Sequence, residues 1–254
     1  MELFDLHVHS TFSDGENEPG EIVLAAIAKG VKTLGFSDHS YTGFDESYCM
    51  QKGRQTEYRK TINALKDAFS GRIKICCGIE QDFYSTVTTD GYDYVIGSVH
   101  YILKDGVYIP VDETAEILKH AAKEHFAGDM LGLCEAYFEN AGRVYEKTKC
   151  NIVGHFDLIT KFNERERLFD EDDPRYINAY KKAVDRVMKD CKVFEINAGD
   201  TGRNPIRPNI SGIISAKREE RFFYQATATR KKHCVLHLIN SGLYFKNNLE
   251  FSLL

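Results

Sequence analysis

Short apolar runs alternate with amphipathic stretches along the chain. Apolar runs and residues that are apolar at every second position predict strands, whereas apolar positions three or four apart between Pro and Gly signals predict helices. The predicted strands are residues 2–9, 33–37, 73–79, 92–99, 152–155 and 193–197. The predicted helices are residues 19–29, 55–69, 113–126, 130–149 and 174–189.

Strands and helices that take turns in this way predict an α/β fold, with a parallel sheet covered by helices. Pro19 and Pro174 stand at helix starts, and Gly30 and Gly71 follow helix ends. A (β/α) barrel suits a chain of 254 residues better than an open sheet, although the pattern alone separates the two poorly. No internal repeat and no linker divides the chain.

Imidazoles and carboxylates stand where the predicted strands end. The first strand ends in His7-Val8-His9, and alternation along a strand places both imidazoles on one face. The carboxyl ends of barrel strands converge on one rim, where active sites are built. The other residues of this kind are His39, Glu80, His100 and His155 at strand ends and Asp14 on a loop.

A single histidine at a strand end is more often a surface or capped residue than a ligand. Five of the nine histidines, however, follow apolar strands, and this coincidence favours a multinuclear metal site. His120 and His125 lie in a charged helix, five residues apart, and are expected at the surface. The seven cysteines form no C-x-x-C pair and are expected to fill the core or the strands as free thiols.

Mixed nitrogen and oxygen ligands suit divalent Mn, Fe or Zn, and the carboxylates could bridge two ions. Such a site activates water and clamps a phosphoryl group, which predicts hydrolysis without a covalent enzyme intermediate. The sequence contains no Gly-rich phosphate loop, nucleophile elbow or dinucleotide fingerprint that would compete.

Composition excludes several other classes of protein. The 33 basic and 38 acidic residues give a net charge of -5, which argues against a general nucleic-acid binder. No run of about 18 apolar residues predicts a membrane span, and no signal peptide is recognisable. Scattered free cysteines are typical of a reducing compartment, so a cytoplasmic protein without nucleic-acid or membrane partners is expected.

The segments DLHVHSTFSDG, FSDHS, GIEQDF, IGSVHY and VGHFDLITKF together resemble the polymerase-and-histidinol-phosphatase (PHP) superfamily. The GHFDL segment is most similar to the histidinol-phosphatase branch. The resemblance covers residues 1–198 and implies a distorted seven-stranded, TIM-like (β/α) barrel with up to three metal ions. It further implies hydrolysis of a small phosphorylated substrate, L-histidinol phosphate, in histidine biosynthesis.

The resemblance also implies roles for individual residues. His7, His9 and Glu80 would hold a first ion, and Asp14 and His39 a second. Glu80 would bridge to a third ion, held by His100 and His155. Lys161 could reach the substrate phosphate, although an ordinary barrel-rim lysine is the more common situation.

The resemblance ends after Glu195-Ile196-Asn197. Related sequences continue with a GYRxxPYPS-like pattern and later a strand ending in S-D-x-H, which completes the first and second metal sites, and neither pattern occurs here. Back-translation of residues 204–209 and 224–229 in one shifted frame permits P-Y-P-S-E-Y and S-S-D-S-H. We therefore interpret residues 199–254 as a frameshifted tail, and we expect the barrel to lack two ligands and one or two strands.

Charge separates the same two parts of the chain. Residues 199–254 contain 9 basic and 4 acidic side chains, a net charge of +5. Residues 1–198 have a net charge of -10, with 24 basic and 34 acidic side chains. The division is thus an acidic, patterned phosphatase barrel followed by a basic, unpatterned tail with no domain of its own.

Three other functions fit parts of the sequence. An amidohydrolase-type barrel also opens with H-x-H, but the SDG, SDH and GIE segments favour the phosphatase. A PHP nuclease acting on DNA ends is disfavoured by the acidic balance. A catalytically impaired metal-binding protein is credible because the tail departs from the pattern. A comparison of histidinol phosphate with a cyclic amide, with Mn added, separates the phosphatase from the amidohydrolase. Metal content measured together with phosphate release identifies the impaired metal-binding protein.

Overall fold

The computed structural model describes residues 3–197 and 221–225. The strands of the main sheet are β1 (Phe4–Val8), β2 (Thr33–Phe36), β3 (Lys74–Asp82), β4 (Tyr94–Ser98), β7 (Ile152–Val153), β8 (Val193–Asn197) and β9 (Arg221–Gln225). The helices are α1 (Pro19–Ala28), α2 (Gln55–Ala68), α3 (Ala115–His125), α4 (Met130–Ala141), α5 (Val144–Thr148), α6 (Asn163–Glu166) and α7 (Pro174–Val187), with a 3-10 turn, η1, at Leu158–Thr160. None of the described helices is both long enough and apolar enough to cross a membrane.

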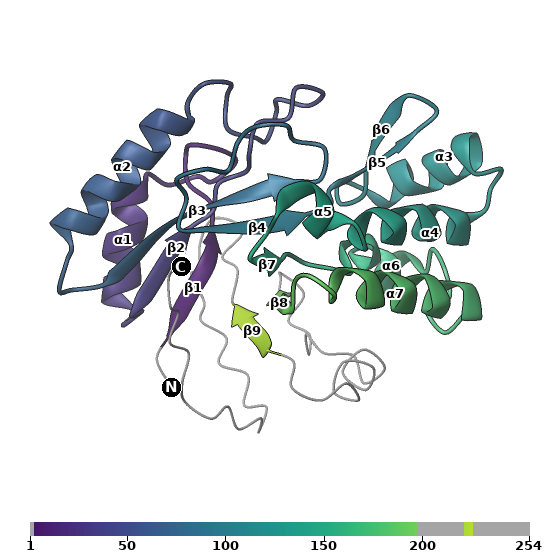
Figure 1. Ribbon diagram of the computed structural model, residues 1–254. Coiled ribbons are helices and arrows are strands. Elements are labelled where there is room, and N and C mark those ends of the chain that lie inside the picture. The colour runs from purple at the N-terminus through teal and green to yellow at the C-terminus, as the bar shows by residue number, and fades with distance from the viewer. Residues whose placement is uncertain (1–2, 198–220, 226–254) are drawn as a thin grey trace.

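The seven strands form one parallel sheet in the order β1-β2-β3-β4-β7-β8-β9. The sheet curls so that β9 lies next to β1, although no ladder joins them in the described part of the chain (Figure 1). This arrangement is the TIM-like barrel that the alternating pattern favoured over an open sheet. All strands run the same way, so their carboxyl ends meet at one rim.

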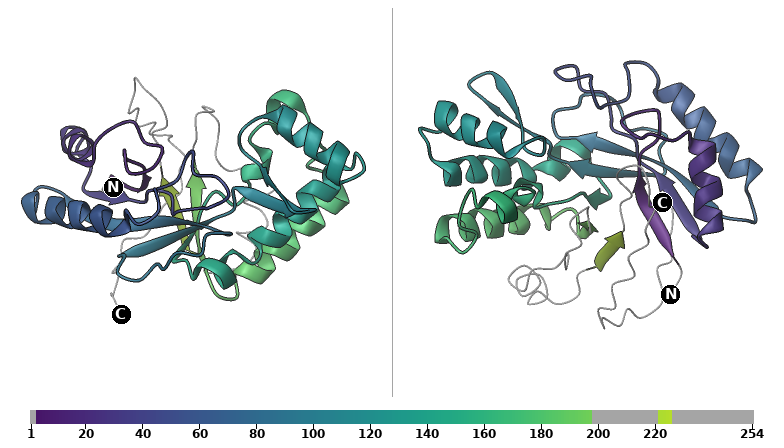
Figure 2. Two further views of the ribbon diagram at one scale, coloured as in Figure 1. Left: turned by 90° about the horizontal axis from the view of Figure 1, so that it is seen from above. Right: turned by 180° about the vertical axis from the view of Figure 1, so that it is seen from behind.

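Helices cover the curled sheet on two sides (Figure 2). Val23 of α1, Ile62 of α2 and Phe36 of β2 belong to one buried apolar cluster. A larger cluster holds the helices α3, α4 and α7 against the other half of the sheet, with Leu118 and Leu133 fully buried. Burial of such side chains stabilises the fold by about 1.5–3 kcal/mol each.

Tyr94 crosses the inside of the curl. Its hydroxyl group, on β4, donates to the carbonyl oxygens of Leu6 on β1 and Phe36 on β2, at 2.5 and 3.1 Å. Glycine is required opposite this ring, because a Cβ at Gly78 would lie 2.2 Å from the Tyr94 ring and one at Gly35 would lie 2.3 Å from its hydroxyl. The tyrosine thus links strands that are not neighbours in the sheet.

The structure differs from the predicted elements in three places. The helix predicted over 130–149 is two helices, because the chain turns at Gly142, where a Cβ would lie 2.9 Å from the Cα of Ala183. An antiparallel hairpin of β5 (Tyr101–Lys104) and β6 (Val107–Pro110) was not predicted. The break at Gly142 depends on packing against a distant helix, which a local sequence pattern does not show. The strands of the hairpin are only four residues long, too short to give a clear alternating pattern.

The third difference falls in the tail. The sequence predicts a barrel that lacks one or two strands, yet Arg221–Gln225 pairs with β8 and supplies a seventh strand. The segment Arg-Phe-Phe-Tyr-Gln is rich in aromatic residues, which favour strands. The rest of the predicted tail, including the shifted motif positions 204–209 and 226–229, lies outside the described residues.

The cysteines were predicted to be free thiols in the core or the strands, and His120 and His125 to lie at the surface. The six described cysteines are free thiols, and all except the half-buried Cys76 are buried. His120 is exposed, as predicted. His125 is only partly exposed, and its Nδ1 lies 3.2 Å from Asp105.

Candidate metal centre

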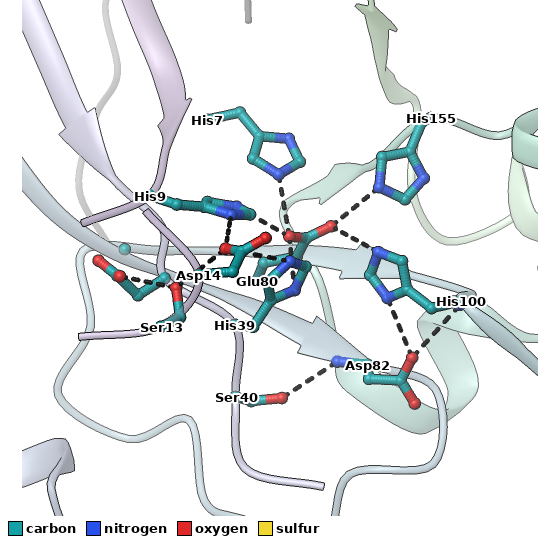
Figure 3. A network of polar contacts seen from close by, with 12 residues as sticks. His7, His9, Ser13, Asp14, His39, Ser40, Glu80, Asp82, His100 and His155 are labelled. Atoms are coloured by element: carbon teal, nitrogen blue, oxygen red, sulfur yellow. Dashed lines mark hydrogen bonds and ion pairs between the residues drawn. The ribbon is translucent and has the colours of Figure 1, made fainter. Parts of the chain in front are cut away.

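Glu80, on β3, lies at the centre of the imidazoles that the strand ends supply, and its side chain is fully buried (Figure 3). The Nε2 atoms of His7 and His9, at the end of β1, lie 2.9 and 3.1 Å from its Oε2. Both imidazoles point to one side of β1, as the H-x-H alternation predicts. His39 follows β2, forms an isolated parallel bridge with Glu80 and brings its Nδ1 within 3.0 Å of the same oxygen.

The second oxygen of Glu80 faces two further histidines. The Nε2 of His155, just after β7, lies 2.9 Å from Oε1. The Nε2 of His100, after β4, lies 3.4 Å from the same atom. One carboxylate is therefore surrounded by five imidazoles that come from the ends of four strands, β1, β2, β4 and β7.

Asp14 borders this cluster from the loop after β1. Its Oδ1 lies 2.7 Å from His9 Nδ1 and 3.8 Å from His39 Nε2, and its side chain is 43% exposed. All seven residues predicted from the strand-end pattern thus lie in one cluster.

Lys161 lies outside the cluster. Its Nζ donates to the main-chain oxygen of Asp112 at 2.7 Å, and the side chain is 46% exposed. Asp112 lines the cavity beside the histidines, whereas Lys161 is not among the residues that line it.

Three buried carboxylates of the site were not singled out from the sequence. Glu195, on β8, lies 3.0 Å from His7 Nδ1, and Asp82 lies 3.2 Å from His100 Nδ1. Asp38 accepts hydrogen bonds from the hydroxyl groups of Ser10 and Ser13, which hold the loop that leads to Asp14. Asp82 ends β3, Asp38 lies two residues after β2, and Glu195 lies within β8. A rule that considered every carboxylate in or just after a strand would have included them.

The buried carboxylate and imidazoles of the cluster shift one another's pKa values. Burial opposes ionisation of Glu80, but His7, His39 and His100 outweigh it and hold its pKa well below the ordinary range. Burial also opposes protonation of His9, yet hydrogen bonding to Asp14 and Glu80 raises its pKa to about 9. At His39 burial dominates and lowers the pKa.

Several polar atoms at the centre of the cluster have no hydrogen-bond partner. Glu80 Oε2, His9 Nε2 and His39 Nδ1 are buried and close together, but their geometry satisfies no hydrogen bond. Buried polar atoms are normally paired, so such a group indicates a missing partner. A cation between them would accept all three lone pairs.

The spacing of these atoms fits that interpretation. Two sets of ligand atoms, in each case within 4.8 Å of one another, could hold an ion: His7, Glu80 and His155, and His9, His39 and Glu80. Ligands about 2.1 Å from a tetrahedral ion lie about 3.4 Å apart, close to the nitrogen–oxygen distances of the cluster. Glu80 belongs to both sets and could bridge two ions.

A cavity of about 300 Å³ opens beside the cluster. It is lined by Asp14, His39, Ser47, Tyr48, His100, Tyr101, Asp112 and Glu113. A larger hollow of about 410 Å³ lies between α4 and α7 and contains none of the clustered residues. We therefore regard the smaller cavity as the one that admits a ligand to the histidines.

Known proteins share both the sequence pattern and the fold. The chain is 28% identical over 171 residues to a Deinococcus radiodurans protein named "Probable histidinol-phosphatase", covering 63% of this chain and 62% of that protein. It is 29% identical over 174 residues to the histidinol-phosphatase of Lactococcus lactis, covering 64% and 59%. The matches thus span about three fifths of the length of these curated relatives.

A solved structure shares the fold. The crystal structure of the Lactococcus lactis histidinol phosphate phosphatase, complexed with zinc, L-histidinol and phosphate, superposes with a TM-score of 0.62 at 21% sequence identity. The superposition covers 89% of this chain and 85% of that chain. The sequence pattern of the PHP domain matches residues 5–199, the part of the chain that carries all the clustered residues. The chain belongs to the PHP-domain family.

Proposed function

We propose that this chain is a metal-dependent phosphatase that hydrolyses L-histidinol phosphate to L-histidinol and phosphate. The observation that carries the proposal is the buried cluster of five imidazoles around Glu80, whose central atoms lack hydrogen-bond partners. The names of the similar proteins support the choice of substrate. Support also comes from the cavity, whose volume of about 300 Å³ suits a small molecule.

The resemblance implies one ion on His7, His9 and Glu80, but the structure groups the ligand atoms differently. We propose that His7, Glu80 and His155 hold one ion and that His9, His39 and Glu80 hold another. Asp14 contacts the second set through His9, and His100 faces the second oxygen of Glu80. Divalent ions, when bound, would supply Lewis acidity toward the phosphoryl oxygens and the attacking water. We propose Mn, Fe or Zn, because imidazole and carboxylate ligands accept all three.

The chain's own residues would orient and shield the reaction. Asp82 holds the ring of His100, and Glu80 holds five imidazoles in fixed positions, so little reorganisation is needed when a ligand enters. Asp14 is partly exposed at the cavity, and although burial opposes its ionisation, His9 and His39 lower its pKa and keep it a carboxylate. Lys161 would contact the phosphate only if its side chain left the Asp112 carbonyl oxygen.

Release of inorganic phosphate tests the proposal. The chain, loaded with Mn²⁺ or Zn²⁺, should release phosphate from L-histidinol phosphate faster than from phosphomonoesters of similar size that lack the amino and imidazole groups. Removal of the ions with a chelator should abolish the activity, and readdition should restore it. No phosphate release from any phosphomonoester by chain that has bound metal would contradict the proposed activity.

A second candidate function is a metal-binding protein without catalytic activity. One specific observation favours it: the S-D-x-H pattern expected after Asn197 is absent from the sequence. Ligands of a coupled metal site act together, so loss of some of them is expected to reduce turnover strongly. Bound metal without turnover in the assay above would select this candidate.

A further inference from the structure

Glu195, on β8, contacts two of the clustered histidines, and its side chain is fully buried. Its Oε1 lies 3.0 Å from Nδ1 of His7, which belongs to β1. Its Oε2 accepts a hydrogen bond from the main-chain N–H of His155, after β7, at 3.0 Å. The two oxygens of one carboxylate thus connect a residue of β1 with the segment that follows β7, two strands that are not neighbours in the sheet.

The contacts of Glu195 are selective. His7 and His155 form, with Glu80, one of the two sets of atoms that could hold an ion. His9 and His39 form the other set, and in the described residues Glu195 has no hydrogen bond or ion pair with either of them. His9 instead places its second ring nitrogen on Asp14.

The contact between Glu195 and the His155 N–H lies where the backbone has few other hydrogen bonds. β7 consists only of Ile152–Val153, so few ladder hydrogen bonds fix the chain where it leads to His155. The carboxylate of Glu195 supplies an additional acceptor at that point. Burial of a carboxylate costs free energy unless the carboxylate is paired. An apolar side chain would fill the same space without that cost, so the polar contacts of Glu195 are the reason for a carboxylate at this position.

The chemistry of the His7 ring points the same way. An imidazole that donates through Nδ1 keeps its Nε2 lone pair available, and a carboxylate acceptor makes that lone pair more basic. The Nε2 of His7 faces Glu80 Oε2, where an ion would lie. Glu195 therefore controls both the tautomer of one ligand and the backbone position of another.

We propose that Glu195 is a positioning residue that selectively assembles the set formed by His7, Glu80 and His155 for one metal ion. This inference rests on the proposed function, because it assigns Glu195 a role toward the metal of that site. It predicts that changes at Glu195 weaken binding of one ion and leave the set of His9 and His39 able to bind another.

Zinc titration of the full chain, with a competing chromophoric chelator, tests the proposal. Glu195→Ala should weaken one class of zinc sites by about 10- to 100-fold and leave the other class near its original affinity. Glu195→Gln keeps one acceptor oxygen but turns a donor toward the second N–H group, so an intermediate loss is expected. It also serves as the milder variant if the alanine variant folds poorly.

A second readout does not depend on metal. Hydrogen exchange of the His155 amide in the metal-free chain should accelerate at least about 10-fold in Glu195→Ala, because that N–H loses its acceptor. Asp93→Asn is the matched control, since Asp93 also accepts from a main-chain N–H, that of Cys77, and pairs with Lys66. Asp93 precedes β4 and lies away from the strand ends that carry the histidines.

The outcomes separate the two proposals. No zinc binding by the unaltered chain would overturn the proposed function, and with it the metal role of Glu195. Zinc binding that is unchanged in both Glu195 variants would overturn the role of Glu195 alone. Equal weakening in Asp93→Asn would also overturn it, because the effect would then reflect general stability. Selective weakening together with faster His155 exchange would support it.

Discussion

At the scale of single residues, Glu80 is the group on which the candidate site depends. Each of its oxygens faces imidazoles, and its ionised form balances the positive charge that His7 and His100 carry in the metal-free chain. Burial opposes protonation of His7 and His100, but Glu195 and Glu80 together raise the pKa of His7, and Glu80 and Asp82 together raise that of His100. Without this carboxylate the imidazoles would be buried without a common acceptor.

Replacement of Glu80 by glutamine keeps the size of the side chain but removes its charge. We expect loss of at least one bound ion and a fall in phosphatase activity of at least about 100-fold, because a ligand common to both sets is lost. Elemental analysis of the purified protein and phosphate release measure the two effects. A glutamine variant that retains its metal and its activity would contradict the central role of Glu80.

The pH dependence of stability follows from His9. Its pKa in the folded chain is about 9, above the ordinary 6.5, so the protonated ring stabilises the metal-free fold most fully below pH 6.5. That stabilisation is lost as the pH rises through about 9. Thermal unfolding of the metal-free chain should therefore show a Tm that falls over this interval.

His9→Gln should flatten this part of the profile, whereas His120→Gln, at an exposed position, should leave it unchanged. Coincident profiles for the His9 variant and the unaltered chain would show that His9 does not set the slope. Zinc competes with protons for the same nitrogen, so saturating zinc should also flatten the profile.

At the scale of elements, the sheet is held in its curl by close packing between strands. Tyr94 reaches across from β4 to the carbonyl oxygens at β1 and β2, and it fits only because Gly35 and Gly78 have no Cβ. The positions of the strand ends, and hence of the histidines, depend on this contact.

Gly78→Ala should destabilise the chain by about 1–3 kcal/mol, because the added methyl group overlaps the Tyr94 ring. Urea unfolding measures the change. Gly20→Ala on α1 is the control, since no atom lies within 4 Å of the added Cβ, and alanine favours the helix. Equal stability of the two variants would show that the ring moves aside without cost.

At the scale of the whole molecule, the chain combines an acidic, patterned body with a basic tail. The PHP-domain match ends at residue 199, next to the point at which the sequence departs from the expected pattern. Arg221–Gln225 nevertheless adds a parallel strand beside β8. The tail therefore contributes backbone to the sheet even though the expected ligand motif is absent.

Sequencing of the gene across codons 195–240 tests the frameshift interpretation. A shifted frame should encode the missing P-Y-P-S and S-D-S-H segments. A chain that carries this restored frame should bind more metal and release phosphate faster than the present chain. An uninterrupted frame at high coverage, matched in close relatives, would remove the sequencing-error explanation.

The sequence by itself determined most of the strands and helices and the seven candidate ligands, because strand-end histidines and carboxylates stand out against apolar runs. It did not reveal the pairing of β9, the hairpin, or the roles of Glu195, Asp82 and Asp38. Those depend on contacts between residues distant in the chain, such as Glu195 with His7. Local patterns fix what each strand end carries, whereas only the curl of the sheet decides which ends meet.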